Sequence, residues 1–185
     1  MTNTEATSDN LEQISIKNLD VPLEQSIFFR SLIRELSGLL EEMIGIEEAS
    51  GYISVVGQRV GTEIDNQYRK KLQVDHLNKA QVGEVLVDLK KRIEGDFYVI
   101  ELDEDKIVLG NRACPFGDKV INRPSLCMMT SNVFGTIAAD NNDYAKVVLG
   151  KTIASGDSMC HVTVYFNETE ESEQQEGQEY YRAEG

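Results

Sequence analysis

The stretch that decides the fold runs from Asn111 to Phe166 and reads NRACPFGDKVINRPSLCMMTSNVFGTIAADNNDYAKVVLGKTIASGDSMCHVTVYF. It contains all three cysteines of the 185-residue chain, which are Cys114, Cys127 and Cys160. It also contains a rigid loop, Cys-Pro-Phe-Gly, because proline fixes the backbone and glycine permits a turn. The stretch therefore predicts a sensor or metal-binding half-domain, which the preceding helices support.

Within this stretch, the sequence predicts one helix and two strands. The helix is expected over residues 126–139, after Pro124 and Ser125. Strands are expected over residues 144–153 and 160–166, because both segments are rich in β-branched and aromatic residues. In the last strand, alternate residues from Cys160 to Phe166 share one face.

Upstream of the cysteines, apolar spacings of three and four residues predict helices over 23–45, 48–72 and 78–93. A hairpin of two strands follows over residues 97–109. Helices that are separate from an antiparallel sheet define the α+β class, so we expect the N-terminal helices to pack on a four-stranded antiparallel sheet. The first helix is long and strongly apolar, which also makes it a candidate dimer interface.

The acidic charge belongs mainly to the two ends of the chain. Of the net charge of −14, residues 1–22 contribute four acids against one Lys, and residues 167–185 contribute seven Glu against one Arg. We therefore expect disordered tails over 1–22 and 167–185, flanking a sensor domain over 23–166. Such acidity disfavours direct nucleic-acid binding. With no long apolar run and no secretory signal, no membrane is expected and the expected location is cytoplasmic.

The three cysteines are candidate ligands of one metal or cluster. Cys114 follows a strand, Cys127 lies in the first turn of a helix, and Cys160 begins the strand that closes the sheet, so pairing of the hairpins would bring them together. Thiolates are preferred ligands of zinc and iron–sulfur clusters, and a helix N-terminus favours the thiolate of Cys127. Buried structural cysteines and a redox thiol pair stay open as alternatives.

A closed tetrahedral site needs a fourth ligand beside three thiolates. His161 has poor geometry for this role because it is adjacent to Cys160 in a strand. Asp118, Asp157, a residue distant in sequence, water or a small thiol could serve. A cysteine-dependent hydrolase or redox enzyme is the alternative from another class, but a nucleophilic cysteine needs a nearby base. The only other histidine is His76, in a polar link.

Two glycines on the second predicted helix, Gly57 and Gly61, lie four residues apart and therefore share a face. Small residues there allow another backbone to approach closely. The pair predicts either tight helix packing or a pocket for a small apolar ligand beside the helix of Phe134.

The order Cys-Pro-Phe-Gly, Pro-x-x-Cys and Gly-Asp-x-x-Cys-x-Val-x-Val resembles the methanogen output domain, and more distantly the vinyl-4-reductase-type sensor domains. The cysteine loop also resembles the sensor half of repressors of iron–sulfur-cluster assembly genes. The resemblance implies a non-enzymatic sensor that signals to a separate regulatory protein, with Cys114, Cys127 and Cys160 holding a cluster or zinc. Where zinc-binding relatives carry an acidic and a further cysteine ligand, this chain has Thr152, Ile153 and Ala154.

Overall fold

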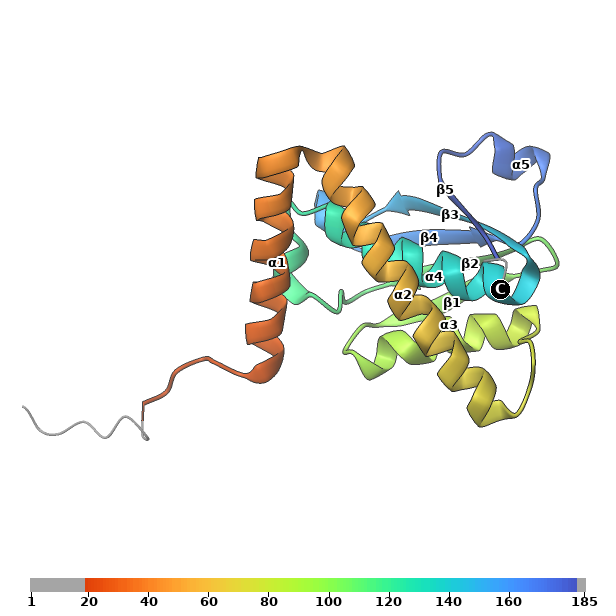
Figure 1. Cartoon of the computed structure of the whole chain (residues 1–185), viewed down its shortest axis with the longest axis horizontal. Helices are drawn as coiled ribbons and strands as arrows, with labels where there is room; N and C mark the ends of the chain where they lie inside the picture. The colour runs from red at the N-terminus through yellow and green to blue at the C-terminus, as the bar shows by residue number, and fades with distance from the viewer. Residues whose placement is uncertain (1–18, 183–185) are drawn as a thin grey trace, which may run out of the picture.

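The computed structural model describes residues 19–182 and confirms the α+β class (Figure 1). The predicted N-terminal tail lies outside the described residues up to position 18. The helices are α1 (Gln25–Ile44), α2 (Ile46–Leu72), α3 (Lys79–Arg92), α4 (Ser125–Asn142) and α5 (Glu170–Glu173), with short 3-10 helices η2 (Gly117–Val120) and η3 (Ile153–Ser155). The strands are β1 (Phe97–Leu102), β2 (Lys106–Asn111), β3 (Tyr144–Lys151), β4 (Cys160–Tyr165) and β5 (Gln178–Tyr181).

The sheet is antiparallel and has the strand order β1-β2-β4-β3-β5. Both predicted hairpin pairings are present, and β2 pairs with β4 between them. In that central pairing, Asn111 at the end of β2 lies opposite Cys160 at the start of β4. This register brings the loop that follows β2 to the beginning of β4.

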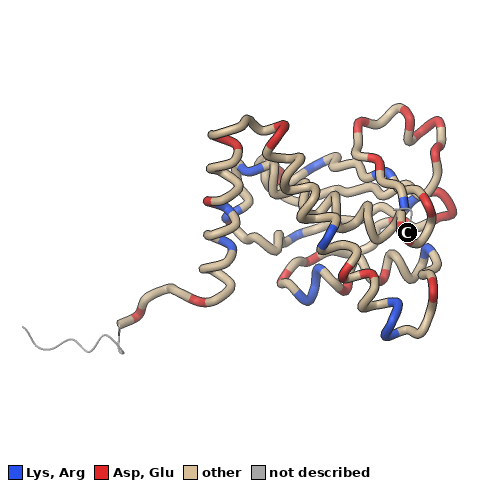
Figure 2. Tube along the Cα trace, viewed as in Figure 1, with Lys and Arg blue, Asp and Glu red and all other residues tan. Residues whose placement is uncertain are grey.

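The sheet has five strands rather than four, because part of the segment predicted to be a disordered acidic tail is ordered. Residues 178–181 form β5 against β3, and Tyr180 on this strand is buried. A capping box between Thr169 and Ser172 stabilises the α5 turn. Glu171 forms an ion pair with Lys106 over 2.8 Å. Acidic residues gather on this loop in Figure 2. The capping box, the ion pair of Glu171 and the burial of Tyr180 nevertheless hold the segment in a defined structure.

The helices that cover the sheet are α3 and α4, whereas the prediction placed all the N-terminal helices there. The layer formed by α4 lies against β3 and β5, and α3 lies against β1. The long α2 crosses the outer side of α4, and α1 stands apart from the sheet (Figure 1). Because α4 is enclosed by α2 and the sheet, it is buried all round from Ser131 to Ala139. The helix predicted over residues 126–139 is α4, and it is the central helix of the fold.

Gly57 and Gly61 serve tight helix packing, which was one of the two interpretations of this pair. A Cβ added to Gly57 would lie 2.8 Å from Cβ of Asn132, and one added to Gly61 would lie 3.0 Å from Cβ of Thr136. The backbones of α2 and α4 are therefore in close contact at this crossing. The alternative, a ligand pocket at the two glycines, is wrong because α4 already fills that space.

The apolar stripe of α1 faces away from its own chain. Only Ser37 and Gly38 are buried on this helix, whereas large apolar residues of the stripe are exposed. The exposed set comprises Phe28, Phe29, Leu32, Leu36, Leu39, Met43 and Ile44. The apolar face of α1 is thus exposed on the surface of the molecule instead of packing on the sheet. No helix of the described part of the chain is both long enough and apolar enough to cross a membrane.

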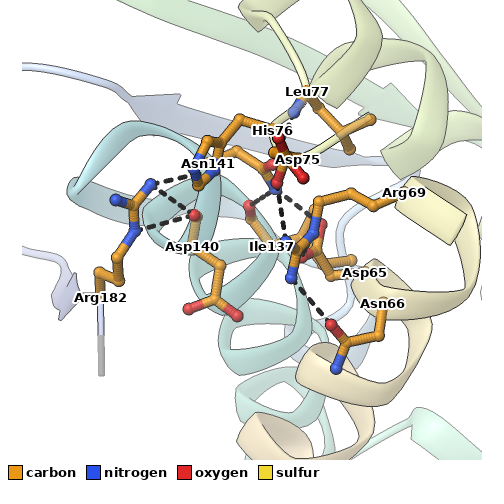
Figure 3. Close-up of polar contacts among 10 residues, drawn as sticks. All are labelled: Asp65, Asn66, Arg69, Asp75, His76, Leu77, Ile137, Asp140, Asn141 and Arg182. Atoms are coloured by element: carbon orange, nitrogen blue, oxygen red, sulfur yellow. Dashed lines mark hydrogen bonds and ion pairs between the residues drawn. The ribbon is translucent and has the colours of Figure 1, made fainter. Parts of the chain in front are cut away.

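A polar network fastens α2 to the C-terminal end of α4 (Figure 3). Asp65 is fully buried, and its carboxylate accepts from Arg69 Nε over 2.7 Å and from Asn141 Nδ2 over 2.6 Å. The side-chain oxygen of Asn141 in turn accepts the main-chain N–H of Leu77. Every oxygen of the buried carboxylate is paired, so this charge fixes α2 and the link after it against α4.

Candidate functional site: a thiol cavity

The three cysteines line one small cavity, as the predicted strand pairing requires. Cys114 comes from the loop after β2, Cys127 from the first turn of α4, and Cys160 from the start of β4. The cavity has a volume of about 30 Å³, which is room for about one water molecule. Its remaining wall is mainly apolar and includes Phe97 and Leu126.

Each sulfur atom has polar neighbours in its own chain. Cys160 Sγ accepts weak hydrogen bonds from Asn111 Nδ2 over 3.6 Å and from the main-chain N–H of Ile153 over 3.5 Å. The side chain of Thr152 lies beside Cys127 and lowers the pKa of its thiol against the effect of burial. Thr152 and Ile153 thus lie beside the sulfurs.

Burial keeps the thiols of Cys114 and Cys127 in the protonated form. Burial first, and then the neighbouring thiols of Cys114 and Cys160, raise the pKa of Cys127 to about 12. Burial also raises the pKa of Cys114, against the lowering effects of a main-chain N–H from Phe116 and the charge of Lys90. Desolvation therefore outweighs the helix N-terminus that was expected to favour the thiolate of Cys127. Thiols with raised pKa are weak nucleophiles.

A buried lysine stands beside the cysteines, and the sequence analysis did not select it. Lys90 on α3 is only 4% exposed, and its Nζ donates to Thr130 Oγ1 over 2.8 Å. The same ammonium lies 5.1 Å from the ring centre of Phe134 and 5.5 Å from that of Phe97. Burial lowers the pKa of Lys90 to about 8, partly offset by the cysteines nearby. In the sequence, Lys90 follows Val82 and Leu86 at spacings of four residues, which places it on the apolar face of the helix. This spacing was the signal that could have identified Lys90 as buried.

The residues considered as a fourth ligand are not in the wall of the cavity. His161 faces the other side of β4 from Cys160, and Asp157 accepts the main-chain N–H of Thr152 over 2.9 Å. Within residues 19–182, no three His, Cys, Asp or Glu side chains are arranged so that they could hold a metal ion together. The donor chemistry of three thiols suits zinc or a cluster, but the sulfurs would have to move closer together. Metal binding here stays a prediction.

The segment between Cys114 and Cys127 is held by α1. Arg34 donates hydrogen bonds to the main-chain carbonyls of Lys119 and Ile121, the second over 2.9 Å. Glu41 accepts from Arg123 Nη1 over 3.1 Å and from the hydroxyl of Ser125. These contacts bridge α1 to both sides of the turn that leads into α4. A movement of the cysteine loop therefore changes the groups that position α1.

A larger cleft adjoins the thiol cavity. It has a volume of about 390 Å³ and lies between α1, α2, the end of α3 and α4. The cleft and the cavity share Pro115, Phe116 and Thr130 in their walls, so one layer of side chains separates them. The apolar pocket expected at Gly57 and Gly61 is thus found elsewhere, on the face of α2 that carries Val60 and Ile64.

Three comparisons place the chain among known proteins. Residues 32–165 match methanogen output domain 1, and no curated protein matches. The phenol-responsive sensory domain of the transcription activator PoxR, solved with phenol, is 14% identical with a TM-score of 0.58, over 78% of this chain and 76% of that one. A trafficking protein particle complex subunit 3 from Naegleria fowleri, covalently bound to palmitic acid, is 12% identical with a TM-score of 0.54, over 85% and 98%. At these identities the structural likeness shows a shared fold.

Proposed function

The chain belongs to the methanogen output domain 1 family, and from this premise we propose that it is a regulatory sensor module that signals to a separate protein. The observation that carries the proposal is the convergence of Cys114, Cys127 and Cys160 on one cavity whose loop is held by α1. The shared fold with a phenol-responsive sensory domain supports a sensing role. A state change at the cavity would reach the surface through α1.

The occupant proposed for the cavity is a metal held by Cys114, Cys127 and Cys160. The present volume of about 30 Å³ is close to that of a single bound atom, which favours zinc over an iron–sulfur cluster. A cluster would require the loop that carries Cys114 to move outward. Three thiolates and one divalent ion carry a net negative charge, which the buried ammonium of Lys90 would balance. Binding must displace protons from thiols of raised pKa, so affinity should increase with pH.

The test is a metal count on protein purified without oxygen. We expect zinc, or iron with sulfide, near one site per chain in the wild type and its loss in Cys127→Ser. Met128→Ser is the matched control, because Met128 is the neighbouring residue on α4 and lines neither the cavity nor the cleft. Wild-type protein without metal would refute the metal part of the proposal.

A binding role is proposed rather than a catalytic one. No histidine lines the thiol cavity among the described residues, and the raised pKa of Cys127 opposes the thiolate that a nucleophile needs. We expect none of the three thiols to react rapidly with iodoacetamide at pH 7. A single fast-reacting cysteine in the folded protein would instead favour the cysteine-dependent enzyme. The reduced thiols also suit the proposed cytoplasmic location.

A homodimer through α1 is the remaining part of the proposal. The exposed apolar residues from Phe29 through Leu36 to Met43 recur at alternating spacings of three and four, which is the pattern of a helix–helix seam. Monomeric proteins rarely leave such a continuous apolar surface in water. Sedimentation should show a dimer that Leu36→Lys dissociates. Ile100→Lys on β1, where Ile100 is 48% exposed against 54% for Leu36, should leave the dimer intact.

A further inference from the structure

The cleft beside the thiol cavity has the size and the lining of a small-molecule site. Its volume of about 390 Å³ lies within the range of roughly 300–1,000 Å³ that is usual for ligand pockets. Apolar side chains form most of its wall and include Phe29 and Ile33 on α1, Val60 and Ile64 on α2, Leu89 on α3, and Met129 and Val133 on α4. Such a wall favours the apolar part of a ligand.

One positive charge is buried in that wall. Lys90 lines the cleft and is only 4% exposed. Among residues 19–182, no carboxylate forms an ion pair with it, and its one hydrogen-bond acceptor is the hydroxyl of Thr130. Thr130 lies in the wall of the same cleft. The faces of Phe97 and Phe134 give the ammonium weak further support.

A buried ammonium is stabilised most by an anion. A hydroxyl and two aromatic rings replace only part of the hydration that Lys90 loses, because the full charge stays uncompensated. An anionic group in the cleft would supply the opposite charge in a medium of low polarity, where an ion pair with hydrogen bonds is strong. The apolar side chains, which form most of the remaining wall, favour hydrocarbon for the rest of such a ligand.

The wall of the cleft includes a pair of opposite charges from different elements. Arg30 on α1 and Glu94, just after α3, form an ion pair, and both line the cleft. This pair joins α1 to the end of α3 beside the cleft. Because α1 contributes both this ion pair and apolar side chains to the wall, occupancy of the cleft is linked to the position of α1.

We propose that this cleft binds an apolar monocarboxylate, with the carboxylate paired to Lys90 and Thr130 and the hydrocarbon against α1, α2 and α4. The inference rests on the proposed sensor function and names the chemical class of a signal. It can be tested on protein with or without metal at the cysteines.

The experiment compares octanoate with 1-octanol, which has the same chain length and no charge. The chain contains no Trp, so Phe29→Trp places a single fluorescent reporter in the cleft wall. Phe28→Trp is the matched control, because Phe28 is its neighbour on α1 and is not part of the wall. Octanoate should change the emission of Phe29→Trp saturably, and at least about tenfold more tightly than 1-octanol does.

Removal of the charge tests the role of Lys90. In Phe29→Trp with Lys90→Met, octanoate binding should weaken about tenfold to a hundredfold while 1-octanol binding is kept, which also shows that the variant is folded. Thr130→Val should weaken octanoate binding to a smaller extent. Equal affinities for the two probes, no binding of either, an equal response of Phe28→Trp, or an unchanged preference in Lys90→Met would each overturn the proposal.

The metal content of the same samples separates this proposal from the proposed function. Cysteine-dependent metal without an octanoate preference would overturn the cleft ligand alone. An octanoate preference in protein without metal would overturn the cysteine site alone. If Lys90→Met lowers the metal content and leaves octanoate binding unchanged, the lysine serves the cysteines and the cleft proposal is wrong.

Discussion

Arg34 on α1 donates a hydrogen bond to the main-chain carbonyl of Ile121 over 2.9 Å. This contact joins the helix with the exposed apolar stripe to the loop between Cys114 and Cys127. The cavity proposed as the sensing site and the α1 surface proposed as the homodimer interface are therefore one contact apart.

Loss of the Arg34 side chain should loosen the cysteine loop. In Arg34→Met, amides of residues 117–123 should exchange with deuterium about tenfold faster, because two main-chain carbonyls lose their donor. Hydrogen exchange followed by mass spectrometry measures this. Glu35→Gln is the control on the exposed side of the same helix and should leave exchange unchanged. Equal exchange in the two variants would show that α1 does not hold the loop.

Asp65 should be among the most sensitive positions for stability. Asp65→Ala leaves Arg69 and Asn141 without their buried partner, so the free energy of unfolding should fall by about 3–5 kcal/mol. Urea denaturation at neutral pH gives this value. Glu63→Ala, two residues earlier and exposed, should change stability by less than about 0.5 kcal/mol. A loss below about 1 kcal/mol for Asp65→Ala would contradict the network of Figure 3.

Gly135 should not tolerate a side chain, because β5 packs directly on it. A Cβ at this position would lie 2.0 Å from the ring of Tyr180. Gly135→Ala should therefore destabilise the protein by about 1–3 kcal/mol and free β5 from the sheet. Gly51→Ala meets no atom within 4 Å and should stabilise α2 by about 0.5–1 kcal/mol. Thermal unfolding of both variants, which differ from wild type by the same methyl group, compares the two sites.

Lys90→Met should stabilise the metal-free protein at neutral pH, by roughly 1–3 kcal/mol. The folded-state pKa of Lys90, about 8, lies below the value of 10.5 for a free lysine. Between these two values the unfolded chain binds more protons than the folded one, so the stability of the wild type rises with pH. The gain from Lys90→Met should hence be largest below pH 8 and shrink toward pH 10.5. Urea titrations of chelator-treated protein at pH 7 and pH 10 measure the difference, and a gain that grows with pH would contradict the burial of an uncompensated charge.

Much of the backbone could be predicted from local signals. The helix predicted to begin at residue 78 does begin there, because Asn78 caps α3 and forms a capping box with Gln81. The alternation in β4 correctly places Cys160 with Val162 on the core face. Convergence of the cysteines followed from one assumed pairing, β2 with β4, and the register of Asn111 with Cys160 confirms it.

The remainder depends on contacts that one segment cannot reveal. The heptad-like stripe of α1 shows that a face is apolar, but not whether its partner lies in the same chain. Lys90 occupies a core position because β1 and α4 enclose it, whereas the apolar Ile93 on the next turn is 50% exposed. The glutamate-rich sequence around residues 178–181 gave no sign that they form a strand. The contact that holds this strand is between Tyr180 and Gly135, which are far apart in sequence.

The strand order has a consequence during synthesis. β3 is translated before β5, so one side of β3 presents unpaired main-chain groups until β5 arrives to cover it. An open strand of this kind can recruit strands from other nascent chains. A chain truncated between the two strands would keep β3, with eight residues, as its edge, whereas β5 replaces it with an edge strand of four residues.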